Sequence, residues 1–208
     1  MKLVSCFCGT AVAMIVLSTG VSRLDRGMPT VPAGVRAANA SLAAMSDESV
    51  YQLGSTWTND RGEPLQLVTL AGSAEVVAMV YTRCTSLCPT LVHDLKSMDR
   101  SIHGRSRSRT RYVLVTMDPE HDTPAALAEY RRHMGLEDDR WVLLRGSDAD
   151  TRELAAVLGF AYGRGDGRNY SHSSLVTVLD RGGRIVHQQT NVGTDPQRAV
   201  AAIQSIVR

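Results

Sequence analysis

The chain is organised around one stretch, Met79-Val80-Tyr81-Thr82-Arg83-Cys84-Thr85-Ser86-Leu87-Cys88-Pro89-Thr90. The uncharged, valine-rich run at 76–81 that leads into it is typical of a strand buried on both faces. Pro89 suits the first turn of a helix, where its missing N–H costs nothing, so a helix is predicted over 89–102. Two thiols, four positions apart, therefore stand between a buried strand and a helix.

The surroundings of both cysteines favour the thiolate. A helix that begins directly after Cys88 would place unpaired N–H groups and the positive end of the helix dipole beside that sulfur. Arg83 adds a positive charge next to Cys84. The sequence thus predicts that Cys88 ionises easily, and a thiolate is the form that binds metal or attacks a disulfide.

The length of 208 residues and the net charge of +2 suit one globular domain with an N-terminal appendage, and this charge gives no indication of nucleic-acid binding. The apolar run at 3–21 resembles an export signal, and the small residues at 38–40 offer a cleavage site. The same run is long enough to remain as a membrane anchor, so both alternatives stay open. We therefore expect an exported protein, periplasmic or anchored facing the periplasm, with signal or anchor and tether at 1–40 and a linker at 41–50.

The positions of the four cysteines restrict the possible functions. Cys6 and Cys8 fall in the targeting segment, which leaves Cys84 and Cys88 for the mature domain. Disulfides persist in exported proteins, so a plain structural disulfide is one interpretation of the pair. A domain of the remaining size can build its core without such a cross-link, and this favours a metal-binding or redox function.

The rest of the chain alternates strand and helix patterns. A hairpin is predicted from the runs at 55–58 and 65–68, and a second one from those at 174–179 and 184–187. Between them we predict strands at 112–117 and 141–144, helices at 124–134 and 147–158, and a polar loop at 163–169, with a final helix from 195 to 207. This order predicts an α/β, thioredoxin-like domain over 51–208 with an N-terminal β-hairpin, and it places the cysteines at the carboxyl end of a strand.

Charged and aromatic residues outside the cysteine motif have simpler interpretations. The alternating arginines at 105–111 are interpreted as a solvated turn rather than as a docking site for an acidic partner. Tyr81 and Trp141 are expected in the core. Solvated faces are expected for four histidines, namely His93, His103, His133 and His187.

The sequence resembles the SCO/SenC family, the copper-binding assembly factors for cytochrome c oxidase. The resemblance runs from about Gly54 to the C-terminus. It rests on three motifs in order: the Cys-x-x-x-Cys-Pro of 84–89, the second signature Val115-Thr116-Met117-Asp118-Pro119-Glu120-His121-Asp122-Thr123-Pro124, and His172-Ser173. One difference is that many members have an acidic residue between the cysteines, where this chain has Thr85-Ser86-Leu87.

The resemblance implies that copper is bound by Cys84, Cys88 and His172. Cu(I) prefers thiolates and accepts imidazole, so this donor set suits it. Zinc would require a fourth ligand, which His121 could supply, and we rank that alternative lower. As part of the second signature, Asp118 and Asp122 are expected to shape a loop near the metal.

Two functions remain open. In the first, the protein is a monomeric copper metallochaperone, not an enzyme, that passes the ion to the copper-site subunit of cytochrome c oxidase. In the second, it is a thiol-disulfide oxidoreductase that keeps the metal-site cysteines of a partner reduced. The spacing favours the first function, because redox motifs of this fold read Cys-x-x-Cys, one residue shorter than the motif here.

Overall fold

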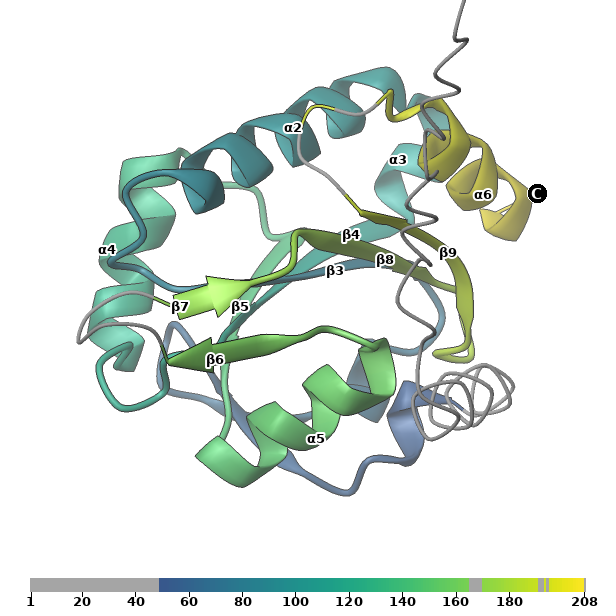
Figure 1. Ribbon diagram of the computed structural model, residues 1–208. Helices are drawn as coiled ribbons and strands as arrows, with labels where there is room; N and C mark the ends of the chain where they lie inside the picture. Colours follow the sequence, from purple (N-terminus) through teal and green to yellow (C-terminus); the bar gives the residue numbers. More distant parts are fainter. Residues whose placement is uncertain (1–48, 165–169, 191–192, 194, 208) are drawn as a thin grey trace, which may run out of the picture.

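A computed structural model describes residues 49–164, 170–190, 193 and 195–207. In this part of the chain the main sheet has seven strands in the order β2-β1-β5-β4-β3-β8-β9, and β6 and β7 form a separate two-stranded sheet (Figure 1). The strands are β1 (Thr56–Asn59), β2 (Pro64–Gln66), β3 (Ala74–Val80), β4 (Thr110–Thr116), β5 (Trp141–Arg145), β6 (Tyr162–Arg164), β7 (Tyr170–His172), β8 (Leu175–Leu179) and β9 (Ile185–Thr190). The α-helices are α2 (Leu87–Ser101), α3 (Gly104–Ser108), α4 (Pro124–Met134), α5 (Asp148–Leu158) and α6 (Gln197–Val207), and short 3₁₀ turns occupy η2 (Val50–Gln52) and η3 (Leu67–Leu70).

The predicted α/β class is confirmed, and so is the N-terminal hairpin formed by β1 and β2. Strands β3, β4 and β5 are parallel, and every residue of β3 is buried, as its apolar pattern predicted. Helices α2 and α6 lie over one face of the sheet and α5 over the other (Figure 1). In the register of β3 and β4, Val80 pairs with Thr116, so the loops that follow these strands emerge side by side.

Local signals place the helices that follow β4 and β5. The Thr123 side chain accepts a hydrogen bond from the Ala126 N–H and caps α4, which ends at a left-handed Gly135. Ser147 and Asp150 form a capping box at the start of α5. Tyr81 and Trp141 lie in the core as expected.

The structure differs from the prediction at two helices. Helix α2 begins at Leu87 rather than Pro89, so Cys88 lies within its first turn and not before it. The predicted loop at 105–111 contains the short helix α3 and the start of β4. Arg105, Arg107 and Arg109 are exposed, as the interpretation as a solvated turn expects, whereas Arg111 is half-buried.

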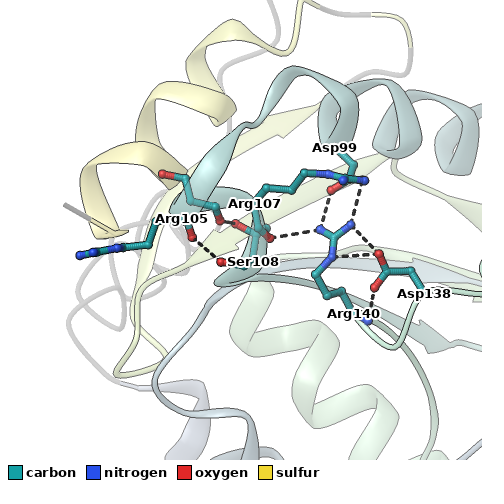
Figure 2. Close-up of polar contacts among 8 residues, drawn as sticks. Asp99, Arg105, Arg107, Ser108, Asp138 and Arg140 are labelled. Carbon is teal, nitrogen blue, oxygen red and sulfur yellow. Dashed lines mark hydrogen bonds and ion pairs between the residues drawn. The ribbon is translucent and has the colours of Figure 1, made fainter.

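Two arginines of this run, Arg107 and Arg111, are held in ion pairs, and Figure 2 shows the pair of Arg107. The carboxylate of Asp99, from α2, accepts a hydrogen bond of 2.7 Å from the Arg107 guanidinium and bonds of 2.6 and 3.0 Å from that of Arg140. Arg111 is paired with the buried Glu75, 3.0 Å away. The ion pairs of Asp99 with Arg107 and Arg140 thus connect α2 to α3 and to the start of β5.

The hairpin of β6 and β7 also went unpredicted, since its strands flank the residues 165–169 that were interpreted as a polar loop. Residues 165–169 themselves lie outside the described residues. His187 was expected on a solvated face, but it is half-buried and its Nε2 atom is fully covered. Its position on β9 explains this difference, because alternate residues of that strand turn toward the protein.

The predicted signal or anchor and tether at 1–40, and most of the linker at 41–50, lie outside the described residues. Among the helices that the structure does describe, none combines the length and the apolar character needed to cross a bilayer.

Candidate metal centre

Cys84 and Cys88 are brought together at the carboxyl end of β3. A turn after the strand, closed by a 3.2 Å hydrogen bond from the Cys84 N–H to the Tyr81 carbonyl, presents Cys84 to the start of α2. Both cysteines are free thiols, and both are buried. The backbone N–H of Cys88 donates to the Cys84 sulfur over 3.3 Å. Since the Ser86 side chain makes no cap bond, the Cys84 sulfur receives an N–H that a helix start leaves unpaired.

These donors determine which sulfur ionises. Burial alone would raise the pKa of the Cys84 thiol. Hydrogen bonds from the backbone N–H groups of Cys88 and Ser86, and from the side chains of Cys88 and Tyr81, outweigh burial and lower that pKa below its ordinary value. Cys84 is therefore the sulfur poised to be a thiolate.

The prediction that Cys88 ionises easily is wrong. Burial raises the pKa of the Cys88 thiol far above its ordinary value, and the hydrogen bond to Cys84 and the charges of Cys84 and Asp122 raise it further. The physical reason is the start of α2 at Leu87, because Cys88 then projects from the first turn into the core and its own N–H serves Cys84. The helix terminus stabilises the first sulfur of the motif rather than the second.

The second signature contacts the cysteine loop, residues 81–86 between β3 and α2, through Asp122. Its carboxylate accepts hydrogen bonds from the Thr82 N–H at 3.0 Å, from the Thr82 hydroxyl at 2.5 Å, and from the Thr116 hydroxyl. The carboxyl group is fully buried, and these three donors satisfy it there. Asp122 thus fixes the residue two positions before Cys84 to the end of β4.

Asp118 connects three segments. Its Oδ2 atom lies 2.6 Å from Nη2 of Arg83, and its Oδ1 atom lies 2.9 Å from Nδ1 of His121 and 3.1 Å from the hydroxyl of Tyr170, which donates to it. Burial would raise the pKa of Asp118, but the contacts with His121, Arg83 and Tyr170 outweigh it and hold the pKa below its usual range. The expectation that the two aspartates shape a loop beside the cysteines agrees with these contacts.

Sequence reasoning missed Tyr170. Its ring packs against that of Tyr81, with centroids 5.2 Å apart, and its hydroxyl binds Asp118. Tyr81 in turn is hydrogen bonded to Cys84, so the β6–β7 hairpin contacts the cysteine loop through this aromatic pair. A signal was available, because Tyr170 lies two residues before His172 and a strand repeats its faces every second residue.

The structure places the third predicted ligand only in part. His172 is the last residue of β7, where it pairs with Tyr162, and its side chain lies outside the described residues. Within the described part of the chain, no three histidine, cysteine or acidic side chains form a metal-binding group. His121 faces Asp118 and Arg83 through Nδ1.

The chemistry of the described donors restricts what this site can bind. Two adjacent thiols, one with a lowered pKa, form a soft donor set of the kind that Cu(I) selects. The nearby carboxylates of Asp118 and Asp122 already accept hydrogen bonds from protein groups. A hard cation that prefers oxygen therefore has no free carboxylate among these two aspartates.

The family model described as SCO1/SenC matches residues 46–208. The chain belongs to the SCO1/SenC family. A curated relative, the SCO2-like protein RT0576 of Rickettsia typhi, is 23% identical over 134 residues, which are 62% of this chain and 64% of the relative. The match thus spans just under two thirds of that relative's length.

Solved structures share the fold of this SCO1/SenC protein. ScoI of Bradyrhizobium japonicum, with copper bound, is 23% identical with a TM-score of 0.61, covering 73% of this chain and 96% of that one. BsSco, described as a member of the Sco family of cytochrome c oxidase assembly proteins and as containing a disulfide switch, is 20% identical with a TM-score of 0.63, covering 73% and 90%. These likenesses support the predicted thioredoxin-like architecture.

Proposed function

We propose that this protein is a copper metallochaperone that binds Cu(I) through Cys84, Cys88 and His172 and delivers it to the copper-site subunit of cytochrome c oxidase. The observation that carries the proposal is the contact between the two reduced cysteines, in which the helix N–H of Cys88 meets the sulfur of Cys84. Membership of the SCO1/SenC family and the copper bound to ScoI agree with it.

The position of His172 supports its role as third ligand. Position 172 lies two residues after Tyr170 on β7, and Tyr170 contacts both Tyr81 and Asp118 beside the cysteine loop. The nitrogen of His172, supplied by a separate hairpin, would complete a set of three donors. Without a fourth protein ligand, the ion would keep a coordination position open. An incoming ligand of the recipient could then displace one donor at a time.

Cu(I) affinity of the reduced full-length protein, purified in detergent and measured against a chromophoric chelator, tests the donor set. We expect Cys84→Ser and Cys88→Ser to abolish tight binding, and His172→Ala to weaken it by more than about tenfold. His93→Ala, at an exposed position of α2, is the matched control and should bind as the parent does. Parent-like affinity in His172→Ala would contradict the three-ligand site.

A second candidate, a thiol-disulfide oxidoreductase, has one specific observation in its favour. The pKa of Cys84 is lowered and that of Cys88 is raised, which is the asymmetry of an attacking and a resolving thiol. Cys84 would attack a partner disulfide to form a mixed disulfide, and Cys88 would then displace the partner thiolate and leave a Cys84–Cys88 disulfide. Steady reduction of a disulfide substrate with supplied thiol reductant tests this, and turnover no higher than that of Cys84→Ser would exclude it.

A further inference from the structure

Asp118 links the β6–β7 hairpin to the cysteine loop through its hydrogen bonds with Tyr170 and Arg83. Asp118 follows β4, and its carboxylate is 1% exposed. On one side it holds Arg83, the neighbour of Cys84, at 2.6 Å, and on the other it accepts the hydroxyl of Tyr170 at 3.1 Å. One buried carboxylate therefore lies between the two segments that carry the proposed ligands.

The β6–β7 hairpin lies apart from the main sheet. Strands β6 and β7 pair only with each other in the described structure and add no strand to the main sheet. A cavity of about 190 Å³ separates part of the hairpin from the first turns of α5 and is lined by Tyr162, Gly163 and Tyr170 on one side and Asp148 and Arg152 on the other, with Met117. Packing is incomplete at this cavity, and the contacts of Tyr170 with Asp118 and Tyr81 join the hairpin to the cysteine loop.

The hydroxyl and the ring of Tyr170 make different kinds of contact, and its backbone adds a hydrogen bond with Tyr81. The ring contact with Tyr81 is apolar and tolerates small displacements, whereas a hydrogen bond to a buried carboxylate depends on distance and angle and is stronger than one between neutral groups. Within the Tyr170 side chain, the hydroxyl is thus the group whose contact depends most on where β7 lies along the cysteine loop. Two residues farther along β7 lies His172.

We propose that the Asp118–Tyr170 hydrogen bond is a positioning device that aligns β7 so that the residue at 172 meets the metal held by Cys84 and Cys88. Tyr170 and Asp118 do not bind the ion; they act through His172. This inference rests on the proposed copper-binding function. It predicts that the Tyr170 hydroxyl affects copper affinity only while His172 is present.

A double-mutant cycle on the full-length protein tests it, with the Cu(I) dissociation constant measured by chelator competition for the parent, Tyr170→Phe, His172→Ala and the double variant. Tyr170→Phe keeps the ring contact and should weaken binding about fivefold to tenfold. The double variant should bind no more weakly than His172→Ala alone. An equal effect of Tyr170→Phe in both backgrounds, or no effect in either, would overturn the positioning role.

The same four proteins separate this inference from the proposed function. Parent-like binding by His172→Ala would overturn the ligand set and the inference with it, whereas a clear effect of His172→Ala with an additive Tyr170→Phe would overturn the inference alone. Tyr162→Phe removes the hydroxyl of the other hairpin strand, which does not contact Asp118, and should leave the affinity unchanged. If Tyr170→Phe does not fold, Asp118→Asn tests the other end of the bond in the same cycle.

Discussion

The backbone N–H of Cys88 donates to the sulfur of Cys84 over 3.3 Å, so a cysteine takes the place of the usual capping hydroxyl at the start of α2. This contact lowers the pKa of the first thiol and leaves the second buried with a raised pKa. The two sulfurs of the motif are therefore chemically different before any metal binds.

The difference predicts selective alkylation. In the reduced, metal-free protein, Cys84 should react with iodoacetamide before Cys88. Its reaction rate should rise with pH, with a midpoint below the ordinary thiol pKa of 9.0. Cys88 should react mainly after denaturation, because it is fully buried. Peptide mapping by mass spectrometry over time measures both rates, and faster labelling of Cys88 would refute the assignment.

Asp99 should contribute substantially to stability. Its carboxylate binds the guanidinium groups of Arg107 and Arg140, and the Arg140 side chain is only 15% exposed (Figure 2). Asp99→Asn removes the charge that both guanidinium groups share, leaves Arg140 with the more exposed Asp138 as its counter-charge, and should lower the free energy of unfolding by about 2 kcal/mol. Urea denaturation checks this value. The matched control is Asp148→Asn, which breaks an exposed pair with Arg152 and should change stability by less than about 0.5 kcal/mol.

Glu75 should make stability depend on pH. Burial raises the pKa of its fully covered carboxyl group to about 7, because it outweighs the pairing with Arg111 on β4. The folded state then binds the proton more tightly than the unfolded state, whose value is 4.5. The contribution of protonated Glu75 to the free energy of unfolding is therefore fully present below pH 4.5. It is lost as pH rises toward 7, by at most about 3 kcal/mol.

Glu75→Gln tests this dependence, since an amide does not titrate and keeps the shape of the protonated acid. Tyr51 lines the same small cavity as Glu75, and its buried hydroxyl stays neutral in this range because burial raises its pKa. Urea denaturation of both proteins between pH 5 and pH 8 should show a smaller fall for the variant. Equal slopes would show that Glu75 is ionised throughout this range.

Gly146 is required by the packing of Trp57. A Cβ atom at position 146 would lie 2.7 and 2.9 Å from two ring carbons of Trp57, which is itself fully buried and cannot move aside. Gly146→Ala should therefore destabilise the protein by about 1–3 kcal/mol in thermal or urea unfolding. Gly54→Ala, where a Cβ meets no atom within 4 Å, is the control and should be nearly neutral.

Much of the fold could be predicted because local signals agreed with the tertiary structure. The apolar runs of β3 and β4, the cap at Thr123 and the capping box at Ser147 each define an element without reference to distant residues. Pro89 misled the prediction of the start of α2, since proline is tolerated anywhere in the first turn of a helix. That displacement of two residues reversed the predicted ionisation of the cysteines.

The parts of the site that escaped prediction depend on contacts between distant residues. Nothing local in the sequence links Asp118 to Tyr170, which are 52 positions apart, or indicates that Arg83 approaches both Asp118 and His121. The β6–β7 hairpin was missed because its strands are only three residues long, too short for a period-two pattern. The cysteine pair was predictable because its spacing is local.

X-ray absorption spectroscopy at the copper edge of the Cu(I)-loaded full-length protein tests the central claim most directly. We predict two sulfur scatterers and one nitrogen scatterer around the ion, with the nitrogen lost in His172→Ala and sulfur lost in Cys84→Ser. A nitrogen contribution that is unchanged in His172→Ala, or a coordination shell without two sulfurs in the parent, would contradict the account.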